Sequence, residues 1–553
     1  MAEKERRRNG HDVQFIEIAR GVRLAKSAWT SSAEQVLNPA ALKLLSELHR
    51  NFEPSRQELL AARAERQTLY DRGAVPEYLD KKSTAANGEW RVAPIPSDLL
   101  CRRVEITGPV NSAKMVINML SRGEDGVRAD CAMLDFEDSC KPSWENVIAG
   151  VHNVIRAARG TLTHHEPAKN GKPDKIYSLK TDDLPVIMVR CRGLHLNESN
   201  LLIGGLAISA GLFDLALCFL HTAKDLLAQG KTPKYYVPKC EHFLEARWWS
   251  GVFAALEDSL GLNRSSLRAT FLIETLPAAF QIEEILYEIR AHAAGLNVGR
   301  WDKIFSDIKT LKFHKDRVLA DRAFIDMNKP WMQNYALRLI EICHRRGAFA
   351  MGGMSAFTPG QAKELREQQL AKVKADKAQE AAMGHDGCWV SHPFFIAPAM
   401  AEFKENNQLQ HLPPLADNYP DLLPQAIGPK TEAGLRKNVR VGIAYLYGWI
   451  NDIGCVAWDN LMEDLATLEI SRAQVWQWQH HGIELENGQK VSGDFVRTIF
   501  AEEFDRILSE VNPPARDQER WTLACSRAVE LFVQEDFQDF LCLTSEVAPI
   551  SQT

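Results

Sequence analysis

The chain lacks several features that would assign it to a protein class at once. No apolar run in its 553 residues is long enough to cross a bilayer, and no apolar stretch of a secretory signal follows the first residues. No G-x-G-x-x-G motif follows the first predicted strand, and there is no P-loop sequence. The eleven cysteines include no C-x-x-C pair, which argues against a zinc ribbon or a dithiol redox site.

An excess of either charge is also missing. Lysine and arginine number 66 and aspartate and glutamate 72, which gives a net charge of −6. This balance speaks against a nucleic-acid partner, and a hydrophobic content of 45% excludes a disordered chain. Because the sequence shows neither a secretory signal nor an S-K-L peroxisomal address, we expect a cytoplasmic protein with reduced cysteines and no membrane partner.

Eight short apolar runs alternate with helix-like segments along the middle of the chain. Strands that alternate with helices predict βαβ units and a parallel sheet. Eight repeats predict a (β/α)8 TIM barrel, and a doubly wound open sheet is the alternative. The predicted strands are "RVEITGP" (103–109), "CAMLDFED" (131–138), "VIMVRCRG" (186–193), "YYVPKCE" (235–241), "ATFLIET" (269–275), "DKIFSDI" (302–308), "FAMGGM" (349–354) and "GCWVSHP" (387–393).

Helical patterns flank the predicted barrel on both sides. Apolar residues recur at three- and four-residue steps over 39–72, and a helical pattern returns over about 435–543. The polar segment 159–184 is expected to be a surface loop. The predicted domains are an N-terminal helical segment (1–95), the barrel (96–400), and a connecting segment with a separate all-helical domain (401–553).

Charged side chains stand at the ends of several predicted strands, where a barrel of this kind places its active site. Two acids, Glu274 and Asp302, come from neighbouring predicted strands, with Asp302 at the start of its strand. They can converge on one Mg2+ ion, which usually takes one or two carboxylates and leaves room for water and substrate. A salt bridge would explain either acid alone. The other strand-end residues are Asp135, Glu137, Asp138, Arg190, Arg192, Lys239 and Glu241.

The segment "GLNVGRWDKIF" (295–305) has more special residues than a plain link needs. Gly295, Gly299 and the amides around Trp301 can form an anion nest for a small carboxylate that also binds the metal. A helix cap followed by a tight loop explains the glycines equally well.

Near the C-terminus, "NLMEDLATLEISRAQVWQWQ" (460–479) begins a predicted helix with Glu463 and Asp464. Acids at the start of a helix suit its dipole, so this position by itself requires no function.

Longer motifs resemble one known family. "IETLPAAFQIEEILYEIRAHAAGLNVGRWDKIF" closely resembles the signature region of malate synthase in its A-type (non-G) form. "RVEITGPV", "DFEDS", "VRCRGLHL", "GAFAMGGM" and "NLMEDLATLEISRAQVWQW" resemble the same family in the same order. The likeness runs from about residue 35 to residue 545.

This resemblance implies a (β/α)8 barrel with an N-terminal helical clasp and a C-terminal helical plug over the barrel mouth. The implied reaction is the Mg2+-dependent, Claisen-type condensation of acetyl-CoA with glyoxylate, followed by hydrolysis to (S)-malate and CoA in the glyoxylate cycle. By position, Glu274 and Asp302 resemble the metal ligands, Arg190 the arginine that stabilises the enolate, and Asp464 the base. The substrate-binding loop for glyoxylate is matched by Gly299, Arg300, Trp301 and Asp302.

The chain departs from the family pattern beside several of these residues. Cys191 replaces the proline of "RPRG", Lys303 replaces the tyrosine of "GRWDYIF", and Ala457, Trp458 and Asp459 stand before "LMED". These changes leave two alternatives to a malate synthase. One is a related acyltransferase that uses a different acyl-CoA or 2-oxo acid, and the other is a barrel that binds CoA or a partner without catalysis. The sequence leaves open whether the chain forms a homo-oligomer.

Overall fold

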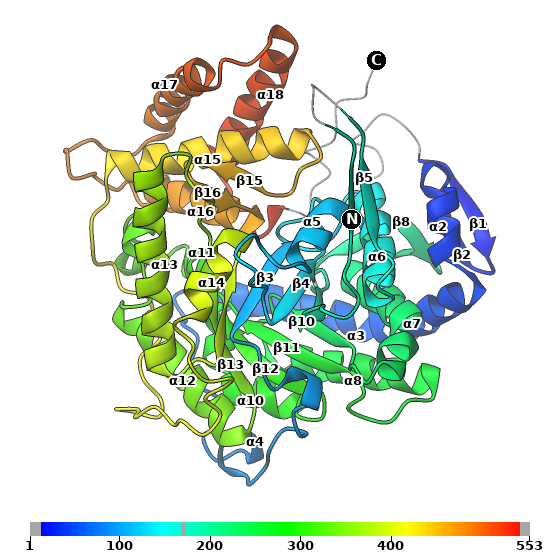
Figure 1. The fold of residues 1–553 in the computed structure, drawn as a ribbon. Helices are drawn as coiled ribbons and strands as arrows, with labels where there is room; N and C mark the ends of the chain where they lie inside the picture. Colours follow the sequence, from blue (N-terminus) through cyan, green and yellow to red (C-terminus); the bar gives the residue numbers. More distant parts are fainter. Residues whose placement is uncertain (1–12, 169–172, 542–553) are drawn as a thin grey trace.

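The computed structural model describes residues 13–168 and 173–541. At its centre, eight parallel strands close a barrel in the order β10-β11-β12-β13-β14-β3-β4-β7 (Figure 1). This closed ring confirms the predicted (β/α)8 barrel and rules out the open sheet. The strands are β3 (Val104–Pro109), β4 (Cys131–Asp135), β7 (Val186–Arg190), β10 (Lys234–Val237), β11 (Arg268–Ile273), β12 (Ala293–Val298), β13 (Phe349–Ser355) and β14 (Gly387–Val390).

The position predicted for the sixth strand was wrong. Residues 302–308 lie in helix α11 (Arg300–Thr310), and the sixth barrel strand is β12. The apolar residues Ile304 and Ile308 stand four apart, so they fall on one helical face, and both are fully buried. A short apolar run of this length fits a strand and a buried helix equally well, because periodicity alone does not separate them.

The position of β12 also corrects the role predicted for Gly295 and the setting of Asp302. Gly295 lies inside the strand, where an added Cβ would come within 2.5 Å of the Phe349 carbonyl oxygen. This glycine therefore allows neighbouring strands to approach and does not belong to an anion-binding turn. Asp302 lies in the first turn of α11 and not at the start of a strand.

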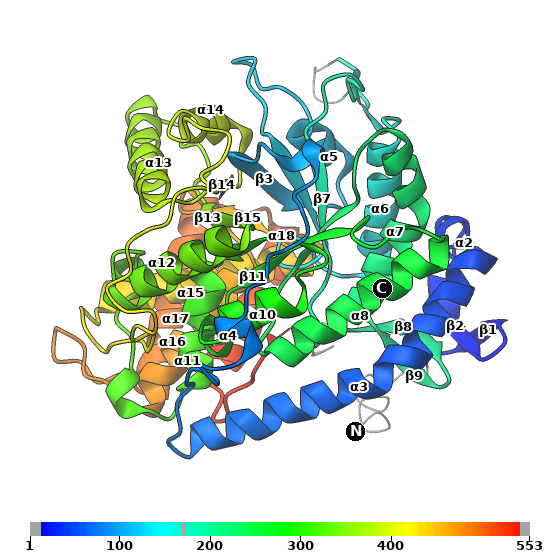
Figure 2. The same ribbon diagram turned by 90° about the horizontal axis from the view of Figure 1, so that it is seen from below.

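Helices surround the barrel on its outer side (Figures 1 and 2). Three of them, α8, α12 and α13, end at a glycine in the left-handed conformation, Gly261, Gly347 and Gly384, which satisfies the last carbonyl groups of each helix. The helices are α5 (Ala113–Met119), α6 (Trp144–Ala158), α7 (Ala210–Ala228), α8 (Phe243–Leu260), α9 (Leu276–Ala279), α10 (Ile282–Glu288), α11, α12 (Pro330–Arg346), α13 (Lys363–Met383) and α14 (Ile396–Met400).

The N-terminal part wraps one flank of the barrel. The long helix α3 (Pro39–Asp71) occupies the predicted helical segment and runs along the lower part of Figure 2, where it packs against α8. Its buried Arg63 pairs with Glu245 of α8 at 2.7 Å, which attaches the helix to the barrel. This part also contains α2 (Ser31–Val36), α4 (Thr84–Asn87), β1 (Phe15–Ala19) and β2 (Val22–Ala25). The two strands form an antiparallel sheet with β8 (Asn197–Ile203) and β9 (Leu206–Ser209), which follow barrel strand β7 in the chain.

The C-terminal part is mainly helical and has its own hydrophobic core. Its α16 packs against α11 of the barrel, so the two cores meet at the barrel mouth. A short hairpin, which the helical pattern did not predict, precedes α16. The elements are α15 (Glu432–Ile450), β15 (Val456–Trp458), β16 (Leu461–Glu463), α16 (Leu465–His480), α17 (Gly493–Val511) and α18 (Ala515–Phe532).

A second hairpin corrects the loop predicted over 159–184. Strands β5 (Thr163–Glu166) and β6 (Lys175–Ser178) pair antiparallel there. The boundaries predicted for the three domains stay predictions. Within residues 13–168 and 173–541, no helix combines the length and the apolar character that crossing a bilayer requires.

Candidate active site

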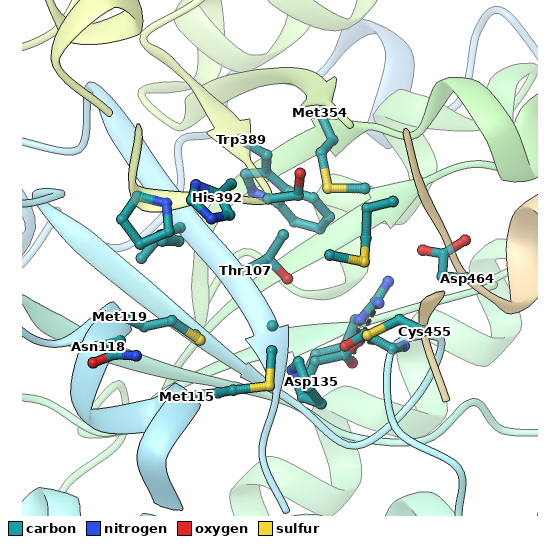
Figure 3. Close-up of a pocket in the computed structure, with 18 of the residues that line it drawn as sticks. Thr107, Met115, Asn118, Met119, Asp135, Met354, Trp389, His392, Cys455 and Asp464 are labelled. Atoms are coloured by element: carbon teal, nitrogen blue, oxygen red, sulfur yellow. Dashed lines mark hydrogen bonds and ion pairs between the residues drawn. The ribbon is translucent and has the colours of Figure 1, made fainter. Parts of the chain in front are cut away.

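A cavity of about 690 Å³ opens at the carboxyl ends of the barrel strands, between the barrel and the C-terminal part. Figure 3 shows Asp135 of β4 and Asp464, which precedes α16, both facing it. The structure brings every predicted site residue to this one cavity. The residues in question are Arg190, Glu274, Gly299, Arg300, Trp301, Asp302 and Asp464.

Arg190 ends strand β7 and is held in a fixed orientation. Its Nε and Nη2 each donate a hydrogen bond of 2.6 Å to Asp135, and its Nη1 donates one of 3.1 Å to Asp138. Burial alone would raise the pKa of Asp135, but the facing guanidinium overrides this and holds the pKa below its usual value. The pair is therefore ionised, with the arginine as a fixed positive charge in the cavity wall.

Lys239 brings a second cation to this region. It follows β10, and its Nζ lies 2.8 Å from Asp138, 3.0 Å from Glu137 and 3.2 Å from Asp302. Burial and the charge of Asp138 raise the pKa of Glu137 well above its usual value. Lys239 is thus shared among three carboxyl groups, an excess of acids over bases that favours the binding of a further cation.

Glu274 and Asp302 approach each other from the end of β11 and the first turn of α11. Burial, together with the charge of Asp302, raises the pKa of Glu274 well above its usual value. Gly299 leaves room for the Glu274 side chain, because an added Cβ there would lie 2.6 Å from Cβ and 2.7 Å from Oε2 of Glu274. Burial raises the pKa of Asp302 as well. A divalent cation would relieve both shifts by stabilising the ionised carboxylates.

The donor set fits Mg2+ and does not fit a metal that needs a full set of protein ligands. In the described ranges 13–168 and 173–541, no three His, Cys, Asp or Glu side chains converge as a ready-made metal site. Mg2+ usually binds through one or two carboxylates and keeps several water or substrate ligands. Glu274 and Asp302 supply two such carboxylates. The Oδ1 atom of Asp302 is buried and lacks a well-aligned hydrogen bond, although the Lys239 ammonium lies 3.2 Å from it.

The start of α11 provides backbone donors. The first amides of a helix have no carbonyl partner within it, so those of Arg300, Trp301 and Asp302 can face an anion. The amide of Gly299 is already engaged with the Tyr335 hydroxyl at 3.2 Å. The Arg300 side chain is also engaged, because its Nη2 donates to the Ile325 carbonyl at 2.6 Å. Arg300 can thus offer its backbone amide to the cavity, while its side chain fixes the segment around Ile325.

Asp464 reaches the cavity from the C-terminal part. It is the N-cap of α16, where its Oδ1 accepts from the Thr467 amide at 3.3 Å and its own amide donates to the Thr467 hydroxyl at 3.0 Å. Burial and the negative charges of Asp138 and Asp302 raise the pKa of Asp464 to about 8. The residue thus caps its helix, as helix-start acids do, and it also presents a carboxyl group to the cavity.

The departures from the family pattern lie outside the cavity lining. Cys191 points to the Tyr236 carbonyl at 3.6 Å and is buried in the barrel wall. Lys303 points away from Asp302 and pairs with Asp307 at 2.5 Å. Trp458 lies in β15 against α18. Among the described residues that line the cavity, none of these three is present, so the geometry gives no support to an altered substrate.

The predicted site residues did not include Lys239, Asp135, Glu137 or Asp138. Their signal was present in the sequence, since each follows or ends a barrel strand as Arg190 and Glu274 do. What the sequence did not show is that their side chains converge with Asp302, which comes from a helix.

Family models for malate synthase match most of the chain. The model "Malate synthase, TIM barrel domain" matches residues 186–414, "Malate synthase, C-terminal" matches 429–547, and "Malate synthase, N-terminal domain" matches 28–83. Malate synthase A of Escherichia coli (strain K12) is 44% identical, an alignment that covers 92% of this chain and 95% of that protein. The malate synthase of Myxococcus xanthus (strain DK1622) is 45% identical over 94% and 95%. The glyoxysomal malate synthase of Candida tropicalis is 40% identical over 87% and 88%.

Proposed function

The chain belongs to the malate synthase family, in its A-type form, and on that basis we propose how the residues at its barrel mouth divide the reaction. As a member it is an acyl-transferring enzyme that condenses acetyl-CoA with glyoxylate to form malate, a step of the glyoxylate cycle. The roles are assigned because four residues from separate elements line one cavity. These residues are Arg190, Glu274, Asp302 and Asp464.

Asp464 is the proposed base. A thioester methyl proton is weakly acidic, so the group that removes it must lie close to it in a site that excludes water. Asp464 is buried, and its raised pKa suits proton transfer near neutral pH better than an ordinary aspartate would. The proton passes from the methyl carbon to an Asp464 oxygen, and the electron pair of the broken C–H bond moves toward the thioester oxygen.

Arg190 is the proposed partner for that oxygen. Because the two hydrogen bonds that it donates to Asp135 hold its guanidinium in place, the positive charge stands ready where negative charge develops. Arginine suits this role because its guanidinium does not lose its proton to the enolate. The enolate carbon then forms a bond to the aldehyde carbon of glyoxylate, and the π pair of the aldehyde moves to its oxygen, which takes up a proton. Water then cleaves the thioester C–S bond, which releases malate and CoA.

Glu274 and Asp302 are the proposed ligands of a divalent cation, for which Mg2+ is the best chemical match. When bound, the cation would polarise the glyoxylate aldehyde and fix its carboxylate. The amides of Arg300, Trp301 and Asp302 at the start of α11 would orient the same carboxylate. The cytoplasmic location and any oligomeric state remain predictions.

The test is the release of CoA thiol from acetyl-CoA with glyoxylate, with malate identified as the product, in the presence and absence of Mg2+. Metal-dependent release that is lost in Glu274→Gln would support the assigned ligands. Full activity after exhaustive removal of divalent cations would overturn the metal role. Full activity in Asp464→Asn would overturn the role of the base.

A further inference from the structure

Lys239 takes part in none of the steps above, yet it touches both carboxylates proposed for the metal. Its backbone amide donates to Oε1 of Glu274 at 2.8 Å, and its Nζ lies 3.2 Å from Oδ1 of Asp302. The side chain is only 5% exposed, so the ammonium group remains within the cluster and out of solvent. One residue thus joins two carboxylates that come from different elements of the barrel.

The backbone at Lys239 is built to hold this arrangement. Lys239 has a φ of +52°, in the left-handed region that lysine rarely adopts. Its carbonyl accepts a hydrogen bond of 2.8 Å from Arg63 of α3, and Arg63 is itself paired with Glu245. Residues held in such a conformation persist only where surrounding contacts enforce it, and they concentrate at functional sites.

The ammonium group occupies a position of strong negative charge. Besides Asp302, it contacts Asp138 at 2.8 Å and Glu137 at 3.0 Å. Several buried carboxylates without a cation would repel one another or take up protons. Lys239 supplies that cation in the absence of a metal. When a divalent cation binds to Asp302, the ammonium group becomes a like charge at short range and opposes binding.

We propose that Lys239 is a positioning residue that acts as a built-in counterion of the metal site. It keeps Glu274 and Asp302 together before the metal binds. When a divalent cation binds, the ion pair between the Lys239 ammonium group and Asp302 breaks. Lys239 thereby has two effects. It preforms the pair of ligands, and it lowers the affinity of the site for the cation. This inference rests on the proposed assignment of Glu274 and Asp302 as metal ligands.

The experiment is calorimetric titration of Mg2+ into the full-length protein, stripped of divalent cations, at pH 8. Lys239→Met keeps the length of the side chain and removes its charge, so we expect it to bind Mg2+ at least tenfold more tightly than the wild type. Lys239→Arg keeps the charge and should bind no more tightly than the wild type. Without Mg2+, Lys239→Met should melt at a lower temperature, and Mg2+ should raise its melting temperature by more than that of the wild type.

Lys377 offers a matched control. It is a fully buried lysine with Asp376 and Glu380 each at 3.0 Å, and it contacts neither proposed ligand. Lys377→Met should lose stability while its Mg2+ affinity stays within about threefold of the wild type. If Lys239→Met does not fold, Lys239→Gln removes the same charge, and purification in Mg2+ supplies a cation during folding.

The outcomes separate this inference from the metal assignment. An affinity of Lys239→Met equal to or weaker than that of the wild type, with Glu274→Gln clearly impaired, would overturn the counterion role alone. A wild-type protein that binds no Mg2+, or a Glu274→Gln variant that binds it normally, would overturn the metal assignment and this inference with it.

Discussion

Arg190 and Asp135 form a pair with two parallel hydrogen bonds, each 2.6 Å long, at the ends of two adjacent barrel strands. Asp135 is fixed in turn by the hydroxyl of Ser139, which donates to its Oδ2 at 2.6 Å. The guanidinium plane is therefore set by the barrel itself and not by substrate. A planar guanidinium that two hydrogen bonds already hold in place loses little conformational freedom when a ligand binds in the cavity.

The first prediction concerns the geometry of this pair. Lys in place of Arg190 keeps a positive charge but cannot form two parallel bonds to Asp135, so the charge would no longer be aimed at the cavity. We expect Arg190→Lys to lower kcat by about a hundredfold or more, the range seen when one preorganised donor is removed from an active site. Steady-state kinetics with acetyl-CoA and glyoxylate measure it. A kcat within threefold of the wild type would show that charge alone suffices.

The second prediction separates the two tasks of Asp464. Asparagine is as good an N-cap as aspartate, so Asp464→Asn should fold with near wild-type stability and yet lose kcat by about a thousandfold or more. Thr467→Ala is the matched control, since it removes the reciprocal capping bond and leaves the carboxyl group. It should cost about 1 kcal/mol of stability with little change in kcat. Thermal melts and turnover measured together test both variants, and an inactive Thr467→Ala would contradict the separation.

The third prediction follows from the pKa of Asp464. Burial and the charges of Asp138 and Asp302 raise that pKa to about 8, so Asp464 holds its proton to a higher pH than an ordinary aspartate does. A base must be unprotonated, and kcat/KM should therefore rise with pH up to this pKa and level off above it. A divalent cation on Asp302 offsets a negative charge and should move the rise to lower pH.

A variant of the neighbouring acid checks this cause. Asp138→Asn removes one of the charges that raise the pKa of Asp464, so the rise in its pH profile should also lie at lower pH than in the wild type. Rate profiles from pH 5 to pH 9 at saturating and limiting Mg2+ make the comparison. An unchanged inflection in both cases would exclude Asp464 as the titrating base.

The fourth prediction concerns the space beside Glu274. Gly299→Ala would place a Cβ 2.6 Å from Cβ of Glu274 and 2.7 Å from its Oε2, so the carboxylate must move. We expect at least tenfold weaker Mg2+ binding and a matching loss of activity at limiting metal. Gly353→Ala is the control, because its added Cβ would meet no atom closer than 3.6 Å. Equal metal affinity in the two variants would mean that the site tolerates the shift.

The barrel was predictable from the sequence because most of its strands are short, apolar and separated by long helical patterns. The exception, β12, begins with two alanines and contains Gly295, so it continues the apolar pattern of the helix before it. The next apolar run, around Ile304 and Ile308, fits a strand of the same length and therefore predicts the sixth strand at the wrong place. Only the closure of the ring, in which β12 pairs with β11 and β13, decides between the two.

The candidate site was predictable in part for a similar reason. Arg190 and Glu274 stand at strand ends, where the rule for such barrels places functional groups. Asp464 stands at a helix start, where residue chemistry alone explains an acid, and it was assigned through family resemblance. The role of Lys239 depends on a left-handed φ and on side chains from several elements, and no local pattern in the sequence encodes that convergence.

The last prediction concerns Lys303, which stands where the family pattern has tyrosine. Its Nζ is buried and pairs with Asp307 at 2.5 Å, and neither residue lines the cavity. Burial raises the pKa of Asp307 to about 6 even with this partner. Removing one member of a buried ion pair leaves an uncompensated charge, which commonly costs about 3–5 kcal/mol. Lys303→Met should therefore lower the melting temperature clearly.

Catalysis should respond differently, because the Lys303 ammonium group pairs with Asp307 and does not line the cavity. We expect Lys303→Met to keep its kcat and its preference for acetyl-CoA over propionyl-CoA within about twofold at a temperature where it is folded. Adding Asp307→Asn removes the stranded charge and should restore much of the lost stability, since both partners are then neutral. A changed preference for acyl-CoA in the single variant, with no change in melting temperature, would reverse this reading and make position 303 a determinant of substrate choice.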